Sequence, residues 1–371
     1  MPQLKIGIIP AMLLFNLAIG ITNHVIIVPL ILQSALRDSW ISALLAIPAV
    51  IVWTIVVYWV MKLTGQQSLF RWFRSHYNSV IAWIVILPLV LLCMMMLFVT
   101  IRDTTIWTKV TYLPKTPYPV TVVLFVASGM VAAAAGIRTI SIAAGILLPA
   151  VVVFGLFVMS VNFQFKDYDY LFPILTRDAA SILRGTQYTL GGLVEFILLL
   201  GLQQHLRKRF RLSALLVLTL AVTGLVFGPL LAAITIFGPF EAADQRYPAF
   251  EQWRMVMIGK FISHLDFLSI YQWLSGSLIR VALAYYLLFD LLQLTRSKWK
   301  LPLMTLIGVL LVAVSSDARI SDTNFFHFIG KHYFPNVMLI FYAFPFILLL
   351  LIFPKRGKAH GTQTSAARNL A

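Results

Sequence analysis

The chain has 371 residues, of which 60% are hydrophobic and 11% are charged, and its mean hydropathy is +0.89. These values lie far outside the range of a water-soluble globular domain, so the sequence predicts an integral membrane protein. The formal net charge of +16 would suit a nucleic-acid-binding protein, but the positions of the charges along the chain favour another interpretation.

Ten apolar runs are candidates for transmembrane helices, each of which needs about 20 residues to cross a bilayer. In chain order they cover residues 6–36, 39–61, 79–101, 118–136, 139–162, 186–204, 212–238, 267–292, 301–315 and 335–353. The runs are continuously apolar, whereas the strands of an outer-membrane barrel alternate in hydrophobicity. We therefore predict an all-α integral membrane protein with about ten transmembrane helices in one domain, 1–354. A disordered cytoplasmic tail, 355–371, is expected to follow.

Charged residues alternate from one loop to the next between these runs. If the N-terminus is cytoplasmic, the segments on that side hold sixteen basic and no acidic residues, and the opposite loops hold twelve basic and eleven acidic residues. The sixteen are Lys5, Lys62, Arg71, Arg74, Arg138, Arg207, Lys208, Arg209, Arg211, Arg296, Lys298, Lys300, Lys355, Arg356, Lys358 and Arg368. This is the positive-inside pattern, so we predict cytoplasmic termini and basic residues that anchor the topology rather than bind nucleic acid.

The number of spans suggests an internal duplication. Two halves of five spans, about 1–162 and 163–354, cross the membrane in opposite directions because five is odd, which gives a five-plus-five inverted repeat. In folds of this kind the first helix of each half, here helices 1 and 6 of the ten, is discontinuous and contributes to a binding site near the middle of the membrane.

Glycines interrupt both of these helices. Helix 1 contains GITN, from Gly20 to Asn23, and helix 6 contains Gly191 and Gly192, followed three residues later by Glu195. Unwinding at glycine frees backbone groups that are tolerated only where they face a cavity or a ligand. We therefore predict that helices 1 and 6 are broken, and that a half-helix starting near Gly192 directs its positive end at a substrate carboxylate. The alternative is that the glycines only allow close helix packing.

Two charged residues lie near the middle of predicted spans, Glu195 in the sixth and Arg280 in the eighth. An ionised side chain at this depth costs about 2.5–3.5 kcal/mol even on the scale derived from insertion experiments. Either the two charges face each other as a structural pair, or they bind the ammonium and carboxylate groups of a zwitterionic ligand. The sequence leaves both alternatives open.

Enzyme motifs of the types HExxH, GxSxG and GxxxxGK[ST] are absent from the sequence, and its seven histidines do not cluster with a spacing that suits a metal. We therefore expect neither catalysis nor a cofactor or metal site, and we expect the function to lie in the helix bundle.

The second long external loop and the helix after it carry a family resemblance. Residues 238–286 read GPFEAADQRYPAFEQWRMVMIGKFISHLDFLSIYQWLSGSLIRVALAYY, and further matches are GIRTIS and DYLFPIL. These motifs resemble the spore germination permease family, the B subunits of nutrient germinant receptors, which is similar to the amino acid, polyamine and organocation transporters. The resemblance implies a receptor subunit in the spore inner membrane that binds a small nutrient such as an amino acid, with an A subunit and a lipoprotein C subunit as partners. An ordinary secondary transporter of an amino acid or another small solute is the alternative.

The resemblance also implies where a ligand binds. In transporters of this fold the first, third, sixth and eighth helices surround the substrate. Carried over by position, the expected ligand site consists of Gly20, Thr22, Asn23, Phe98, Thr100, Gly191, Gly192, Glu195, Ser277 and Arg280.

The charge pattern predicts the labelling of single cysteines. In a chain whose one native cysteine, Cys93, is replaced by alanine, Lys208→Cys and Lys298→Cys should react with a membrane-impermeant maleimide only from the cytoplasmic side. Asp169→Cys and Asp244→Cys should react only from the opposite side, because their loops lack the excess of basic residues that retains a loop in the cytoplasm. Labelling of position 208 in intact cells would overturn this orientation.

Overall fold

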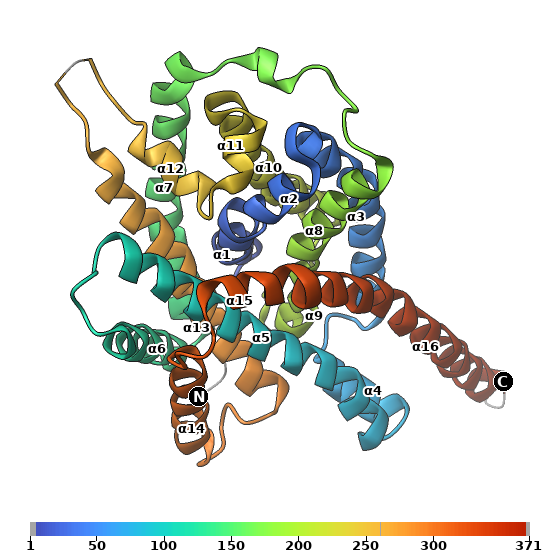
Figure 1. Cartoon of the computed structure of the whole chain (residues 1–371). Coiled ribbons are helices and arrows are strands. Elements are labelled where there is room, and N and C mark those ends of the chain that lie inside the picture. The colour runs from blue at the N-terminus through green and yellow to red at the C-terminus, as the bar shows by residue number, and fades with distance from the viewer. Residues whose placement is uncertain (1–4, 260, 369–371) are drawn as a thin grey trace.

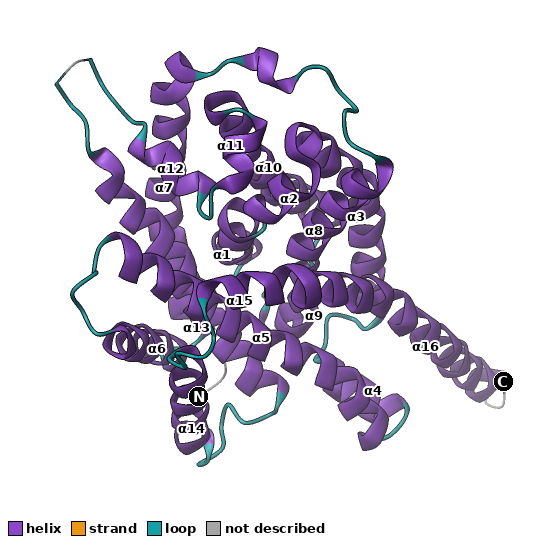
Figure 2. Ribbon diagram, in the orientation of Figure 1, coloured by secondary structure: helices purple, strands orange, loops and turns teal. Residues whose placement is uncertain are grey.

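The computed structural model describes residues 5–259 and 261–368. Within these ranges the regular secondary structure is helical, and β pairing is limited to two isolated bridges, Ile6 with Leu206 and Ile258 with Ile262 (Figure 2). The predicted all-α membrane architecture is confirmed.

All ten predicted spans have a helical counterpart. Seven helical segments of the described chain are long and apolar enough to cross a membrane, and the first of them, Ile8–Leu63, has 56 residues and contains two predicted spans. Two shorter apolar helices, Tyr118–Ala134 and Lys300–Ser315, occupy the places of the fourth and ninth predicted spans. The division of these spans into two inverted halves of five stays a prediction.

The helices of the first half are α1 (Ile8–Ile21), α2 (Val28–Ala35), α3 (Ser39–Leu63), α4 (Leu69–His76), α5 (Ser79–Thr111), α6 (Tyr118–Ala134) and α7 (Ile137–Val161). Those of the second half are α8 (Ala179–Leu193), α9 (Leu199–Leu202), α10 (Leu212–Phe237), α11 (Pro239–Asp244), α12 (Pro248–Arg254), α13 (Leu268–Leu291), α14 (Lys300–Ser315), α15 (Asp322–Phe328) and α16 (Phe334–Arg368). Short 3-10 segments connect several of them.

The first transmembrane helix is broken, as predicted, but slightly later than GITN. Gly20 still belongs to α1, and a π turn, Thr22–Ile26, joins α1 to α2. The amide of Ile27 donates to the carbonyl of Thr22 across this turn at 3.0 Å. Pro29 lies in the first turn of α2 and has no N–H group, so a regular hydrogen bond to the turn before it cannot form. The discontinuity therefore depends on proline as well as on the π turn.

The sixth transmembrane helix is also broken, and here the predicted mechanism is wrong. Gly191 and Gly192 lie within α8, which continues to Leu193, and the irregular segment is the 3-10 stretch Val194–Leu198 that follows. No half-helix begins at Gly192, so no positive helix end points into the bundle from that position. Glu195 itself lies in the 3-10 stretch.

The centre of the bundle is α13. It packs against α1, α5, α6 and α7, and almost every residue in its second half is buried. The irregular stretch of helix 6 follows α8, which packs against α2, α3 and α16 (Figure 1). Helix 1 packs against α13 along α1, and α9 of helix 6 also contacts α13, which in turn packs against α5.

The last span differs from its predicted limits at both ends. It begins at α15, and a π turn, Ile329–Tyr333, joins α15 to α16. The α16 helix then continues past Pro354 to Arg368 and away from the bundle (Figure 1). The segment 355–368, which the sequence predicts to be disordered, is helical, and the final residues 369–371 lie outside the described chain. A run of low apolar content ends a membrane span, but it does not by itself end a helix.

The contact between α6 and α13 predicts the effect of a single methyl group. A Cβ atom at Gly129 would lie 2.3 Å from Cγ1 of Val281, whereas one at Gly145 would meet only Leu13, at 3.8 Å. Gly129→Ala should therefore destabilise the protein by about 1–3 kcal/mol, as overpacking does, and lower its thermal midpoint in detergent. Gly145→Ala, the matched control in α7, should be neutral or stabilising. Adding Val281→Ala to Gly129→Ala should recover part of the loss, and equal midpoints for the two single variants would contradict this account.

Candidate functional site

A buried ion pair joins the irregular part of helix 6 to α13. The guanidinium group of Arg280 donates from Nη1 to Oε2 of Glu195 and from Nη2 to Oε1, the latter at 2.5 Å. Neither side chain is exposed to solvent. This two-point geometry is the strongest form of the arginine–carboxylate interaction. The two charges that the sequence places within spans therefore face each other.

Three further groups complete the coordination of this pair. The hydroxyl of Thr22, in the π turn of helix 1, donates to Oε2 of Glu195 at 3.3 Å. Nε of Arg280 donates to Oγ1 of Thr100 in α5 at 2.6 Å, and Nη1 reaches the carbonyl of Ala18 in α1 at 3.3 Å. We call Thr22, Thr100, Glu195 and Arg280 the buried polar network. It connects helices 1, 3, 6 and 8, the four helices implied by the resemblance.

Asn23 links the two broken helices directly. Its Nδ2 atom donates to the carbonyl of Ile19 at 3.0 Å and to the carbonyl of Gly192 at 3.2 Å, while its Oδ1 atom is buried without a partner. Ser277 lies about one turn before Arg280 on α13 and accepts a hydrogen bond from Thr104 at 2.8 Å. Asn23 thus belongs to the junction beside the network, and Ser277 extends the polar region along α13.

The glycines of the predicted site serve close packing, which was the alternative interpretation. A Cβ atom at Gly191 would lie 2.9 Å from the carbonyl oxygen of Phe334, and one at Gly192 would lie 2.7 Å from Oδ1 of Asn23. At Gly20 a Cβ atom would lie 3.1 Å from Leu225. These residues let neighbouring helices approach, and the backbone at all three positions remains helical.

Phe98 lies apart from the network in its contacts. Its ring packs edge to face against Phe325 and Phe328 of the last span, with centroid distances of 5.9 and 6.4 Å. Among the ten residues predicted for the site, Thr22, Thr100, Glu195 and Arg280 meet through side-chain hydrogen bonds. Asn23 and Gly192 meet each other beside them, through the bond from the Asn23 side chain to the Gly192 carbonyl. Their role in ligand binding stays a prediction.

Arg246, which is not among the predicted site residues, closes the bundle on the side of α11 and α12. Arg246, between these two helices, donates to Asp103 of α5 at 2.8 Å and to Asp322 of α15 at 3.3 Å. Its guanidinium carbon lies 4.5 Å from the ring centre of Tyr247 and 4.6 Å from that of Phe326. Burial lowers the pKa of Arg246, but the attraction of Asp103, Tyr247 and Asp322 outweighs it, so that this pKa lies above its ordinary value. The only signal in the sequence was the position of Arg246 within the motif of residues 238–286.

An aromatic layer lies beside this ion pair. The rings of Trp107 and Trp273 stack at 4.1 Å with an interplanar angle of 4°. Tyr247 packs edge to face on Trp273 at 5.4 Å, and Phe250 does so on Trp107 at 5.7 Å. Arg246 and these four rings form what we call the outer seal. It covers the end of the bundle that the charge pattern assigns to the exterior.

The opposite end is closed by contacts at the end of helix 6. His205 and Gln204 both contact Oδ2 of Asp290 in α13, at 2.7 and 2.6 Å. The start of the chain pairs with the same region, because the amide of Ile6 donates to the carbonyl of His205 at 2.8 Å and the amide of Arg207 donates back to Ile6 at 2.9 Å. The buried polar network is therefore enclosed at both ends.

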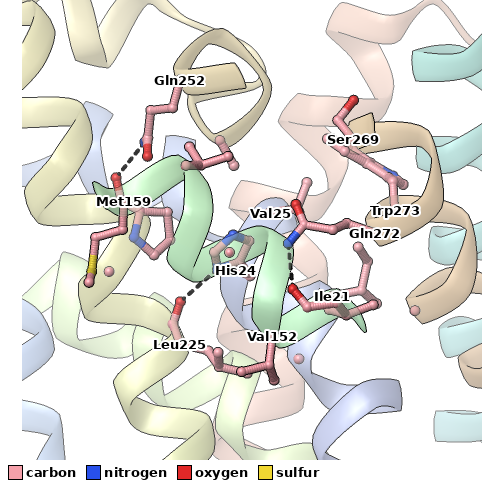
Figure 3. Close-up of a pocket in the computed structure, with 18 of the residues that line it drawn as sticks. Ile21, His24, Val25, Val152, Met159, Leu225, Gln252, Ser269, Gln272 and Trp273 are labelled. Carbon is pink, nitrogen blue, oxygen red and sulfur yellow. Dashed lines mark hydrogen bonds between the residues drawn. The ribbon is translucent and has the colours of Figure 1, made fainter. Parts of the chain in front are cut away.

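A cavity of about 350 Å³ lies on the other side of helix 1 (Figure 3). Residues of α1, the π turn, α7, α10, α12 and α13 line it, and Gly20 is the one predicted site residue among them. The π turn divides the two regions, since Thr22 and Asn23 contact the groups described above whereas His24 and Val25 line the cavity. The sequence carries no signal of this cavity, because its walls are mainly ordinary apolar side chains. In the described residues no group of three or more histidine, cysteine or acidic side chains is arranged to hold a metal ion.

Comparison with known proteins agrees with this architecture. The family model described as spore germination protein matches residues 8–323. The spore germination protein XB of Bacillus anthracis is 38% identical over 339 residues, which cover 91% of this chain and 95% of that protein. The match extends over nine of the ten spans and includes every residue of the buried polar network. The chain belongs to the spore germination protein family.

Proposed function

We propose that this chain is the membrane subunit of a nutrient germinant receptor, located in the inner membrane of the spore, with both termini in the cytoplasm. In this proposal it binds a small nutrient, an amino acid, at the buried polar network and triggers germination together with an A subunit and a C subunit. Membership of the spore germination protein family and the multi-pass helical bundle support the general role.

The observation that carries the ligand site is the fully buried pair of Glu195 and Arg280 at the junction of both broken helices. A well-packed apolar pair would often stabilise a protein core equally well, so a buried ion pair needs a reason beyond stability. The zwitterionic form of an amino acid carries the same two charges. Its carboxylate can replace that of Glu195 on the fork of Arg280, and its ammonium group can bind Glu195.

The neighbouring hydroxyl groups fit this exchange. Thr22 and Thr100 each hold one end of the ion pair, at 3.3 and 2.6 Å, and can hydrogen-bond a ligand that comes between the two charges. Because the pair is closed in the structure, binding requires Glu195 and Arg280 to separate. The ligand thereby acts on helices 1, 3, 6 and 8 at once, and its binding free energy favours the open arrangement of these helices.

Access from the exterior requires the outer seal to move. Arg246 joins the loop between α11 and α12 to α5 and to the last span, so its release frees three elements together. We propose that opening of this seal admits the nutrient and that the resulting movement is transmitted to the partner subunits. A transporter would use the same opening and would then also open at the other end, where His205 and Asp290 meet.

Charge removal at the pair tests this proposal. Spores that lack the native gene should be complemented with Glu195→Gln, with Arg280→Gln and with the double variant. Each single change leaves one buried charge without its partner, which costs about 3–5 kcal/mol, so the amount of protein in the spore membrane should fall. The double change should restore the amount, measured by quantitative immunoblot, but not the germination response to a panel of nutrients.

The control and the contradicting results are specific. Arg254→Gln removes an arginine from an exposed ion pair with Glu251 and should leave amount and response unchanged. Normal dose responses in both single variants would refute a ligand role for the pair. If the double variant recovered both the amount of protein and the germination response, the ion pair would serve helix packing alone. Uptake of labelled amino acid into proteoliposomes would favour the transporter over the receptor.

A further inference from the structure

The cavity between α7 and α10 opens toward the hydrocarbon of the membrane. Val152, Leu156 and Met159 of α7 line it, and 48–54% of the surface of each side chain is exposed. Opposite them, a Cβ atom at Gly224 or Gly228 of α10 would meet nothing within 4 Å. Because α7 and α10 both span the membrane, this open side faces lipid rather than water.

Helices α12 and α13 close the cavity on the side that the charge pattern assigns to the exterior. Trp253 of α12 donates from Nε1 to Oε1 of Gln272 in α13 at 2.8 Å, and Gln272 donates to the carbonyl of Val151 in α7 at 2.8 Å. One glutamine side chain thus joins α7, α12 and α13; Gln272 is labelled in Figure 3. A molecule dissolved in the bilayer has the direct route into this space.

Several polar groups in the cavity lack protein partners, although most of the lining is apolar. The side-chain amide of Asn16 makes no hydrogen bond within the described chain. Nδ1 of His24 donates to the carbonyl of Leu225 at 3.3 Å, which leaves Nε2 of the neutral ring as an acceptor. Gln252 is 6% exposed and donates from Nε2 to Pro229, so its Oε1 atom is also a free acceptor. Free hydrogen-bonding groups inside a membrane span are costly unless a ligand or water satisfies them.

These features define the chemistry of an occupant. Among the described residues, those that line the cavity include no Lys, Arg, Asp or Glu, so none of them compensates an ionic charge. The free acceptors require an O–H or N–H donor, and a volume of about 350 Å³ suits a small molecule. We propose that this cavity is a second binding site, distinct from the buried polar network, for an uncharged and mainly apolar molecule that carries a hydroxyl or amide N–H donor and enters from the bilayer.

An occupant of this cavity would contact the broken helix 1. Ile21, His24 and Val25 form part of the cavity wall, and Thr22 and Asn23 of the same segment contact Glu195 and the carbonyl of Gly192. An occupant therefore contacts one face of the π turn of helix 1, and the opposite face of the same turn contacts the buried polar network.

Photolabelling of the full-length protein in lipid nanodiscs tests the proposal. The probe is a benzyl alcohol with a trifluoromethyl diazirine on its ring, and the matched probe lacks the hydroxyl group.

The alcohol probe should label residues of α1, α7 or α10 within the cavity, and this labelling should be saturable. Unlabelled benzyl alcohol should compete with it, and the matched probe should label the same residues several-fold less. Gly224→Leu, whose Cβ atom would meet nothing within 4 Å and whose side chain would occupy the cavity, should weaken saturable labelling by about tenfold or more. Leu220→Phe, an exposed position on the same helix, should not.

A second variant separates binding from simple lipid contact. Asn16→Leu removes a free amide and no hydrogen bond, so the fold should be kept while the preference for the alcohol over the matched probe decreases. Equal labelling by both probes in the unchanged protein, or unsaturable labelling spread over all exposed residues of α7 and α10, would show that the cavity is an ordinary lipid-filled groove. Either result would overturn the proposal.

Discussion

The arrangement of this bundle depends on the pairing of two oppositely charged side chains that are buried inside it. An arginine or a glutamate in hydrocarbon must be paired, and the two-point contact between Arg280 and Glu195 is formed only if α13 and the irregular part of helix 6 lie side by side. The remaining donor of the guanidinium group then draws in Thr100 of α5, and the carboxylate draws in Thr22 of helix 1. One electrostatic requirement thus determines how four helices meet, and apolar packing fills the space around them.

The breaks in helices 1 and 6 have different physical causes, although they hold equivalent places in the two halves. In helix 1 a proline and a π turn interrupt the regular hydrogen bonding, and the turn presents Thr22 and Asn23 to the interior. In helix 6 the glycines precede the break, where they let α8 approach Asn23 and Phe334 closely. Small residues near a break therefore identify a close helix contact as readily as an unwound backbone.

The sequence predicted the spans well because hydrocarbon thickness acts on every residue of a helix: α10 was expected at 212–238 and lies at Leu212–Phe237. The predicted span for α5 was too short, because Arg102 and Asp103 resemble the charged end of a span. In the structure both charges lie inside the helix, where residues from distant segments pair with them. Glu195 and Arg280 could be selected because charges in apolar runs are unusual. Their mutual pairing, the role of Arg246 and the lateral cavity depend on contacts between distant segments, which local patterns do not contain.

The π turn of helix 1 has a consequence for the two faces of this span. A π turn holds about one residue more than the α-helix that it replaces, and one residue corresponds to a rotation of about 100°. The side chains of α2 are therefore rotated relative to those of α1, compared with a continuous helix. The extra residue of the π turn, together with Pro29, thus gives one span that presents a polar surface to the bundle and a separate surface to the lipid side.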